Sequence, residues 1–177
     1  ILLSQTYQQV SQLRGGLLQR DPKNQLYARG PRSRLPAFTL RDQALAVSGL
    51  LIEKVGGPST KPYMPPKVWK SISNNSYKQD KGANLFRRSL YTYWRRTIPP
   101  PTMMNFNAAA REVCVVRTET TNTPLQALTL MNNKVFIESA RCLAERMFSH
   151  DKNELKQAII FGYQLSTGRL PKPAELD

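Results

Sequence analysis

The thirteen prolines of this chain limit where regular structure can form. Proline lacks an amide hydrogen and clashes with the preceding helical turn, so helix interiors exclude it. Most of the prolines lie in two tracts, between Pro58 and Pro66 and from Pro99 to Pro101. Helices are therefore expected on either side of these tracts, with long proline-ordered loops between them.

Apolar side chains recur at helical spacing outside the two tracts. Over residues 36–55 they form one stripe, and the glycines that follow, Gly56 and Gly57, give a stop signal. Residues 2–18 carry a weaker stripe of the same spacing. We therefore expect a core helix over 36–55 and a polar helix over 2–18.

The strongest helix start lies at Thr123. There the sequence Thr-Pro-Leu-Gln matches a capping box, in which the Thr123 hydroxyl accepts from the Gln126 amide and the Gln126 side chain reaches back. Pro124 suits the first helical position, where no amide partner is needed. Three helices are expected from here on, and the third ends at Gly168.

The two remaining segments are less regular. Residues 58–84 form an irregular stretch that is either functional or held by its aromatic side chains. Residues 86–96 are rich in Tyr, Thr and Trp and favour a strand paired with 113–118, although their apolar positions would also line a helix. The predicted fold class is mainly α: a helical domain with long Pro-rich loops and a short β element.

Residues that carry chemistry are few. His150 is the single histidine, and the two cysteines, Cys114 and Cys142, form neither a CxxC nor a CxxCH motif. A structural zinc site needs four ligands, so we expect no metal and no cofactor in this chain. Because valines surround Cys114, we predict a buried, unreactive thiol, with a disulfide to Cys142 as the alternative.

No enzyme motif stands out. The chain contains no GxSxG, HExxH, GxxxxGK[ST] or GxGxxG sequence, and its carboxylates lie on expected helix faces and caps. We therefore assign no catalytic residue and lean against an enzyme within this chain. No apolar stretch approaches the roughly 20 residues of a membrane span, so no transmembrane segment is expected.

The net charge of +14 is the strongest bulk signal. Such a charge can indicate nucleic acid, an anionic surface or an acidic partner, but the basic residues form no continuous block. Arginine forks bind phosphate, sulfate and carboxylate, which makes four arginines beside aromatic residues the anion-binding candidates. They are Arg87, Arg88, Arg95 and Arg96. The alternative is internal pairing with Asp42, Glu112 and Glu119 and stacking on the aromatic rings.

Long ordered motifs also carry a family likeness. The chain resembles the C-terminal planctomycete-specific domain called PSD-one, the domain of unknown function fifteen-fifty-three. The runs that carry the resemblance are RLPAFTLRDQALAVSGLL, GGPSTKPY, FRRSLYTYWRRTIPPPTMMNFNAAAREVCVVR and TNTPLQALTLMNN, with ILLSQTY at the start and TGRLPKPAEL at the end. Where the family usually has Asp-containing turns, this chain has Asn105-Phe106-Asn107 and Asn132-Asn133, which weakens any case for acid catalysis there.

The resemblance implies a setting more than a reaction. Proteins of this type are large and exported, periplasmic or at the cell surface, and they pair the domain with cytochrome-c-like modules that could carry a c-type haem. Residues 1–177 are thus expected to be a fragment of a single such domain, truncated at both ends. The function is unknown; the first hypothesis is a structural or interaction domain whose partners are other domains of the same polypeptide.

Two alternatives stay open. The chain could form part of a glycan-active enzyme completed by other modules, with anionic polysaccharide as a partner. It could instead be a basic domain that binds polyanions or nucleic acid, although the scattered basic residues make nucleic acid the less expected partner.

Overall fold

The computed structural model describes residues 1–13, 15–31, 33–116, 118–151 and 154–176. The chain divides into two compact units, Ile1–Leu35 and Pro36–Asp177. Helices and loops make up the fold, and β structure in the described ranges is limited to isolated bridges. The mainly α fold class is therefore confirmed.

The first unit is built from turns around one buried carboxylate. Its short helix α1 (Leu17–Arg20) leads into Asp21, whose side chain accepts hydrogen bonds from the amides of Gln25 (2.8 Å) and Leu26 (2.7 Å). The helix expected over residues 2–18 is wrong: the described part of it forms turns as far as residue 8. The side chain of Leu3 is 89% exposed, and a short helix without a packing partner is marginal in water.

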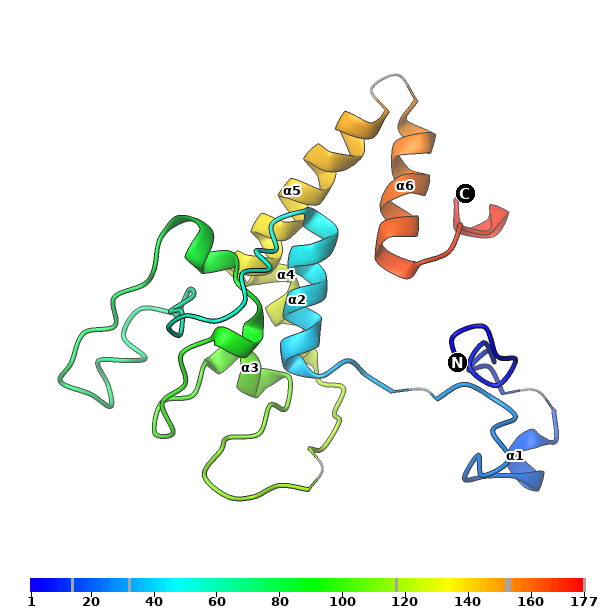
Figure 1. Cartoon of the computed structure of the whole chain (residues 1–177), viewed down its shortest axis with the longest axis horizontal. Helices are drawn as coiled ribbons and strands as arrows, with labels where there is room; N and C mark the ends of the chain where they lie inside the picture. Colours follow the sequence, from blue (N-terminus) through cyan, green and yellow to red (C-terminus); the bar gives the residue numbers. More distant parts are fainter. Residues whose placement is uncertain (14, 32, 117, 152–153, 177) are drawn as a thin grey trace. The chain divides into compact units, whose positions relative to one another are not determined.

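The second unit holds the main helices (Figure 1). Helix α5 packs against α2, α4 and α6, and α3 contacts α2 and α4. The helices are α2 (Ala37–Ser48), α3 (Pro101–Asn105), α4 (Pro124–Asn132), α5 (Lys134–His150) and α6 (Leu155–Thr167), and the 3-10 turns are η1 (Gly82–Phe86), η2 (Ser89–Tyr91) and η3 (Pro173–Glu175). None of the described helices is long and apolar enough to cross a membrane.

Helix α2 ends earlier than the apolar stripe predicts. Gly49 adopts a left-handed conformation (φ 79°), and the amides of Leu50 and Leu51 both donate to the carbonyl of Leu45. This is the geometry of a glycine C-cap, which ends the helix at Ser48, eight residues before Gly56. The predicted end at residue 55 is therefore wrong.

The buried face of α2 is also shifted by one residue from the predicted stripe. The buried residues are Ala37, Arg41, Leu45 and Ser48. The side chains at Leu40, Ala44 and Val47, which the sequence marks as a core stripe, are only half-buried. Leu45 is fully buried and lies at the centre of the unit, together with Ile98 and Met103 from the loop and α3.

The helices after Thr123 agree with the sequence. The capping box is confirmed: the Gln126 amide donates to the Thr123 hydroxyl, and the Thr123 amide donates to Oε1 of Gln126, both at 3.3 Å. Helix α6 ends at Gly168 as predicted. Gly162 lets α6 approach α5 closely, because a Cβ at this position would overlap the Met147 side chain.

The strand predicted for residues 86–96 is wrong. This segment begins at the last residue of η1 and contains η2 between extended residues, with single bridges from Arg87 to Ile52 and from Thr92 to Thr60. The bridges link it to the segment that follows α2, and no pairing with the described part of residues 113–118 exists (residue 117 lies outside the described ranges). Hydrogen bonds from the side chains of Arg41 and Arg87 to main-chain carbonyls hold the segment in this conformation.

Candidate functional site

A buried arginine joins α2 to the segment that contains η1 and η2. Arg41 is 5% exposed, and its guanidinium donates to the carbonyls of Leu85 (2.7 Å) and Arg87 (3.0 Å) and to the Ser89 hydroxyl (3.1 Å). Burial lowers the pKa of Arg41, and the charge of Asp42 opposes that shift. Arg41 therefore acts as a charged anchor inside the unit.

Asp42 completes the attachment from the same helix. Its side chain accepts a hydrogen bond from the Ser89 amide at 2.7 Å. It lies 3.9 Å from the Arg41 guanidinium and 3.8 Å from Nε of Arg88. One short stretch of α2 thus binds the η1–η2 segment through both a cation and an anion.

Arg87 is the first of the four anion-binding candidates, and it is buried. With 3% exposure, it donates to the carbonyls of Lys54 and Pro58, both at 3.0 Å, and to that of Gly56. Its guanidinium lies 4.0 Å from the centre of the Tyr91 ring, and the Tyr91 hydroxyl accepts from the Gly56 amide at 2.8 Å. Arg87 is therefore occupied by the main chain and is not available to an external anion.

The other three candidates have separate partners. Arg88 faces Asp42, as the internal-pairing alternative predicted. Arg95 donates to the Ser73 hydroxyl at 2.8 Å and lies over the Trp69 ring. Arg96, which is exposed, donates to the backbone carbonyl of Glu112 at 3.3 Å rather than to its carboxylate. The four arginines have different partners and do not converge on one site: Arg87 is buried, Arg95 is half-buried, and Arg88 and Arg96 are exposed.

Aromatic rings hold the residues that follow the first proline tract. Trp69 contacts Tyr77 (5.2 Å between ring centres) and Tyr93 (6.1 Å). Burial raises the pKa of Tyr77 above its usual range, and the nearby Asp80 carboxylate adds to that shift. The Tyr77 hydroxyl donates to the Pro62 carbonyl. This part of the irregular segment is thus pinned by its aromatics, one of the two options that the sequence left open.

Gln126 connects the start of α4 to the loop after α3. Its Nε2 donates to the Asn105 carbonyl (2.9 Å), to Oδ1 of Asn107 (3.0 Å) and to the Thr121 hydroxyl (3.1 Å). The residue is 3% exposed, so its amide is buried at the centre of this network. An amide network without an ionisable group offers no general acid or base, and we interpret it as structural.

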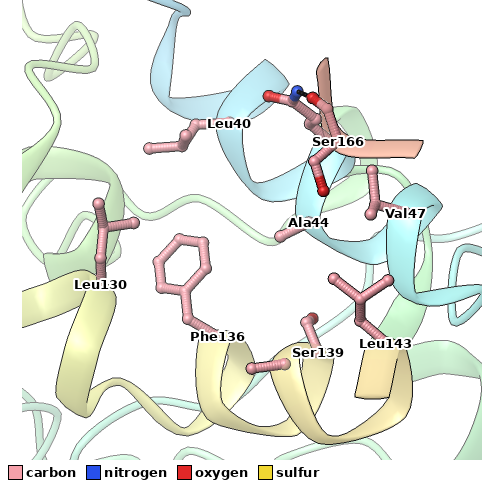
Figure 2. Close-up of a pocket in the computed structure, with 10 residues that line it drawn as sticks. Leu40, Ala44, Val47, Leu130, Phe136, Ser139, Leu143 and Ser166 are labelled. Atoms are coloured by element: carbon pink, nitrogen blue, oxygen red, sulfur yellow. Dashed lines mark hydrogen bonds between the residues drawn. The ribbon is translucent and has the colours of Figure 1, made fainter. Parts of the chain in front are cut away.

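A pocket of about 250 Å³ opens between α2 and α5 (Figure 2). It is lined by Leu40, Gln43, Ala44, Val47, Leu130, Phe136, Ser139, Ala140, Leu143 and Ser166. Figure 2 shows Phe136, Ser139 and Leu143 rising from α5 toward Ala44 and Val47 of α2. No ionisable residue is among those that line it, although the chain carries 26 Lys and Arg.

Neither the burial of Arg41 nor this pocket was predicted from the sequence. Arg41 lies four residues from Leu45 and four from Ala37, so its helical phase is the signal that could have found it. Ser139 could not have been singled out, because its burial depends on how α2 packs over α5.

The prediction that Cys114 is buried is wrong. Both cysteines are free, Cys114 is exposed, and the adjacent Val113 and Val115 are 74% and 48% exposed. Apolar neighbours in sequence do not bury a thiol when the loop that carries them has no surface to pack on. Within the described residues no group of three His, Cys, Asp or Glu side chains comes together at metal-binding distance.

Comparison with known proteins places this chain in a family. The family model described as PSD1, protein of unknown function (DUF1553), matches residues 1–177, and the chain belongs to that family. No curated protein matches it significantly, and neither does any solved structure.

Proposed function

We propose that this member of the PSD1 family is an interaction domain that packs against other domains of a larger exported polypeptide. The observation that carries the proposal is an exposed apolar stripe on α4. Leu125, Leu128 and Met131 recur every three residues along this helix and are 56%, 55% and 72% exposed. A helix that leaves such a stripe in solvent is typical of a surface that meets a partner.

A second helix has the same property. On α6, Leu155 and Ile159 lie one turn apart and are 61% and 43% exposed, while Ala158 and Gly162 bury the face toward α5. Both helices thus use one side within the unit and leave apolar side chains on another. This distribution supports contact with protein surfaces rather than with a charged polymer.

The distribution of the arginines supports the same proposal. The buried guanidinium groups of Arg41 and Arg87 are bound to main-chain carbonyls inside the unit. A dedicated binder of nucleic acid would present such groups on one surface. The exposed Arg88 and Arg96 leave room for weak contact with an anionic polysaccharide, and such contact would be lost by about 0.2 M salt.

Hydrogen exchange tests the interaction proposal. The exchange rates of the α4 amides are measured in residues 1–177 alone and in the polypeptide produced from the complete gene. We expect slower exchange in α4 within the complete polypeptide, with the amides around the fully buried Leu45 as an internal reference that does not change. Equal α4 exchange in both samples would contradict the proposal.

A pair of variants sharpens this test. Leu128→Glu places a charge in the stripe, whereas Leu90→Glu places the same charge on η2, where the side chain is 70% exposed. We expect Leu128→Glu, and not Leu90→Glu, to restore fast α4 exchange in the complete polypeptide. The exported, haem-associated setting is checked on the same material by cell fractionation and by the absorption spectrum of c-type haem.

A further inference from the structure

We propose that the pocket between α2 and α5 binds a small neutral molecule that is largely apolar and carries one hydrogen-bonding oxygen. This inference does not rest on the proposed docking of α4. The pocket is described by four kinds of observation: its lining, its charge, its size and one buried hydroxyl.

The lining comes from apolar residues that the core does not use. Leu40, Ala44 and Val47 form the stripe that the sequence marks as the core face of α2, and they are half-buried because the helix turns the Arg41 and Leu45 face inward. Apolar side chains that face a water-filled pocket lower the free energy when an apolar molecule replaces the water. Burial of these side chains by a ligand would therefore drive binding through the hydrophobic effect.

The charge of the lining restricts the ligand class. A buried charge needs a partner of opposite sign, and none of the ten residues that line the pocket can supply one. Arg146, a cation that contacts α2, donates to the Val47 carbonyl at 2.9 Å and is thus directed to the main chain. A carboxylate, phosphate or ammonium group would lose part of its hydration against this lining without gaining a charged partner, so a neutral ligand is favoured.

The size of the pocket restricts the ligand further. Its volume is about 250 Å³, and an apolar cavity of roughly 150 Å³ is enough to hold benzene. One ring with a short substituent therefore fits, whereas a drug-sized molecule or a sugar chain exceeds the space.

Ser139 supplies the polar contact. The residue is 4% exposed, and within the described residues its hydroxyl has no hydrogen-bond partner. Helical serines usually donate to the carbonyl one turn earlier or point to solvent, as Ser149 does by donating to the Glu145 carbonyl on the same helix. A buried hydroxyl that does neither keeps its hydrogen-bonding capacity, and rotation of the serine side chain presents it to a group seated in the pocket.

The test compares four probes of similar shape. Benzyl alcohol, toluene, benzoate and benzylammonium are titrated at pH 7 while the methyl resonances of Val47 and Leu143 are followed by NMR. We expect saturable shifts with benzyl alcohol, two- to tenfold weaker binding of toluene because it lacks the oxygen, and no saturation with the two ions. Absence of saturation with benzyl alcohol, or equally tight binding of benzoate, would overturn the proposal.

Two pairs of variants locate the site. Ser139→Ala should abolish the preference for benzyl alcohol over toluene, and Ser149→Ala, the same change outside the pocket, should leave it intact. Ala140→Phe fills the pocket from its exposed edge and should weaken both probes at least tenfold, whereas Glu145→Phe, at a position of α5 that is 62% exposed and does not line the pocket, should not. An unchanged preference in Ser139→Ala, or undiminished binding in Ala140→Phe with native methyl spectra, would refute the assignment.

Discussion

Replacing Arg41 with methionine should destabilise the second unit strongly. The substitution keeps an unbranched side chain in the buried site and removes three hydrogen bonds of 2.7 to 3.1 Å. The carbonyls of Leu85 and Arg87 and the Ser89 hydroxyl then lose a charged donor. Removing one partner from such a buried arrangement costs about 3 to 5 kcal/mol, after relief of the arginine's own desolvation.

The matched control is Arg88→Met. This variant makes the same substitution at another arginine that faces Asp42. The Arg88 side chain, however, is 56% exposed, and its Nε lies 3.8 Å from the Asp42 carboxylate. Exposed ion pairs contribute less than about 1 kcal/mol. The two variants therefore separate a buried anchor from a surface charge at nearly the same place.

Urea unfolding followed by tryptophan fluorescence measures both effects, because Trp69 and Trp94 lie in the second unit. We expect Arg41→Met to lower the free energy of unfolding by about 3 to 5 kcal/mol, equivalent to about 6 to 20 °C in melting temperature. If the two variants differ by less than about 1 kcal/mol, the hydrogen bonds of Arg41 only balance its desolvation, and the anchoring argument is refuted.

Three further predictions concern other parts of the chain. Thr123→Ala should cost about 1 kcal/mol by removing the α4 cap, and a melting curve identical to that of the wild type would contradict this. Native Cys114 should react with a small thiol reagent before the half-buried Cys142, and the reverse order, read by mass spectrometry, would be inconsistent with the exposed loop. Hydrogen bonds from the amides of Leu26 and Gln25 hold the pKa of Asp21 below its ordinary value of 3.8, so its contribution to the first unit is complete above that pH and is lost as the pH falls through the lower folded value. An NMR titration of Asp21 with a midpoint at or above 3.8 would refute that reading.

Sequence reasoning succeeded where the determining contacts are local. Thr123 and Gln126 lie three residues apart, so their reciprocal bonds are visible in the sequence, and Gly168 ends α6 by its own backbone conformation. The presence of the helices after Thr123 follows from such short-range signals.

Sequence reasoning failed where contacts with residues far away in the sequence determine the local conformation. Arg87 belongs to a segment whose composition favours a strand, but bonds to carbonyls about thirty residues earlier give it a different path. Gly49 ended α2 inside an apolar stripe that continued beyond it, and Cys114 was judged from valines that turned out to be exposed. The pocket could not be predicted for the same reason, because it depends on α2 burying the face that carries Arg41 and leaving Leu40, Ala44 and Val47 half-buried.

The acceptors of Arg87 have a consequence for how this domain can change. All three are main-chain oxygens, at Lys54, Gly56 and Pro58, and every amino acid carries such an oxygen. The loop therefore keeps its path without using the side chains of its own residues, apart from the two glycines with positive φ at 56 and 57. Mutations can accumulate at the other positions without loss of shape, which makes residues 53–55 a suitable place to graft a foreign peptide epitope onto a rigid frame.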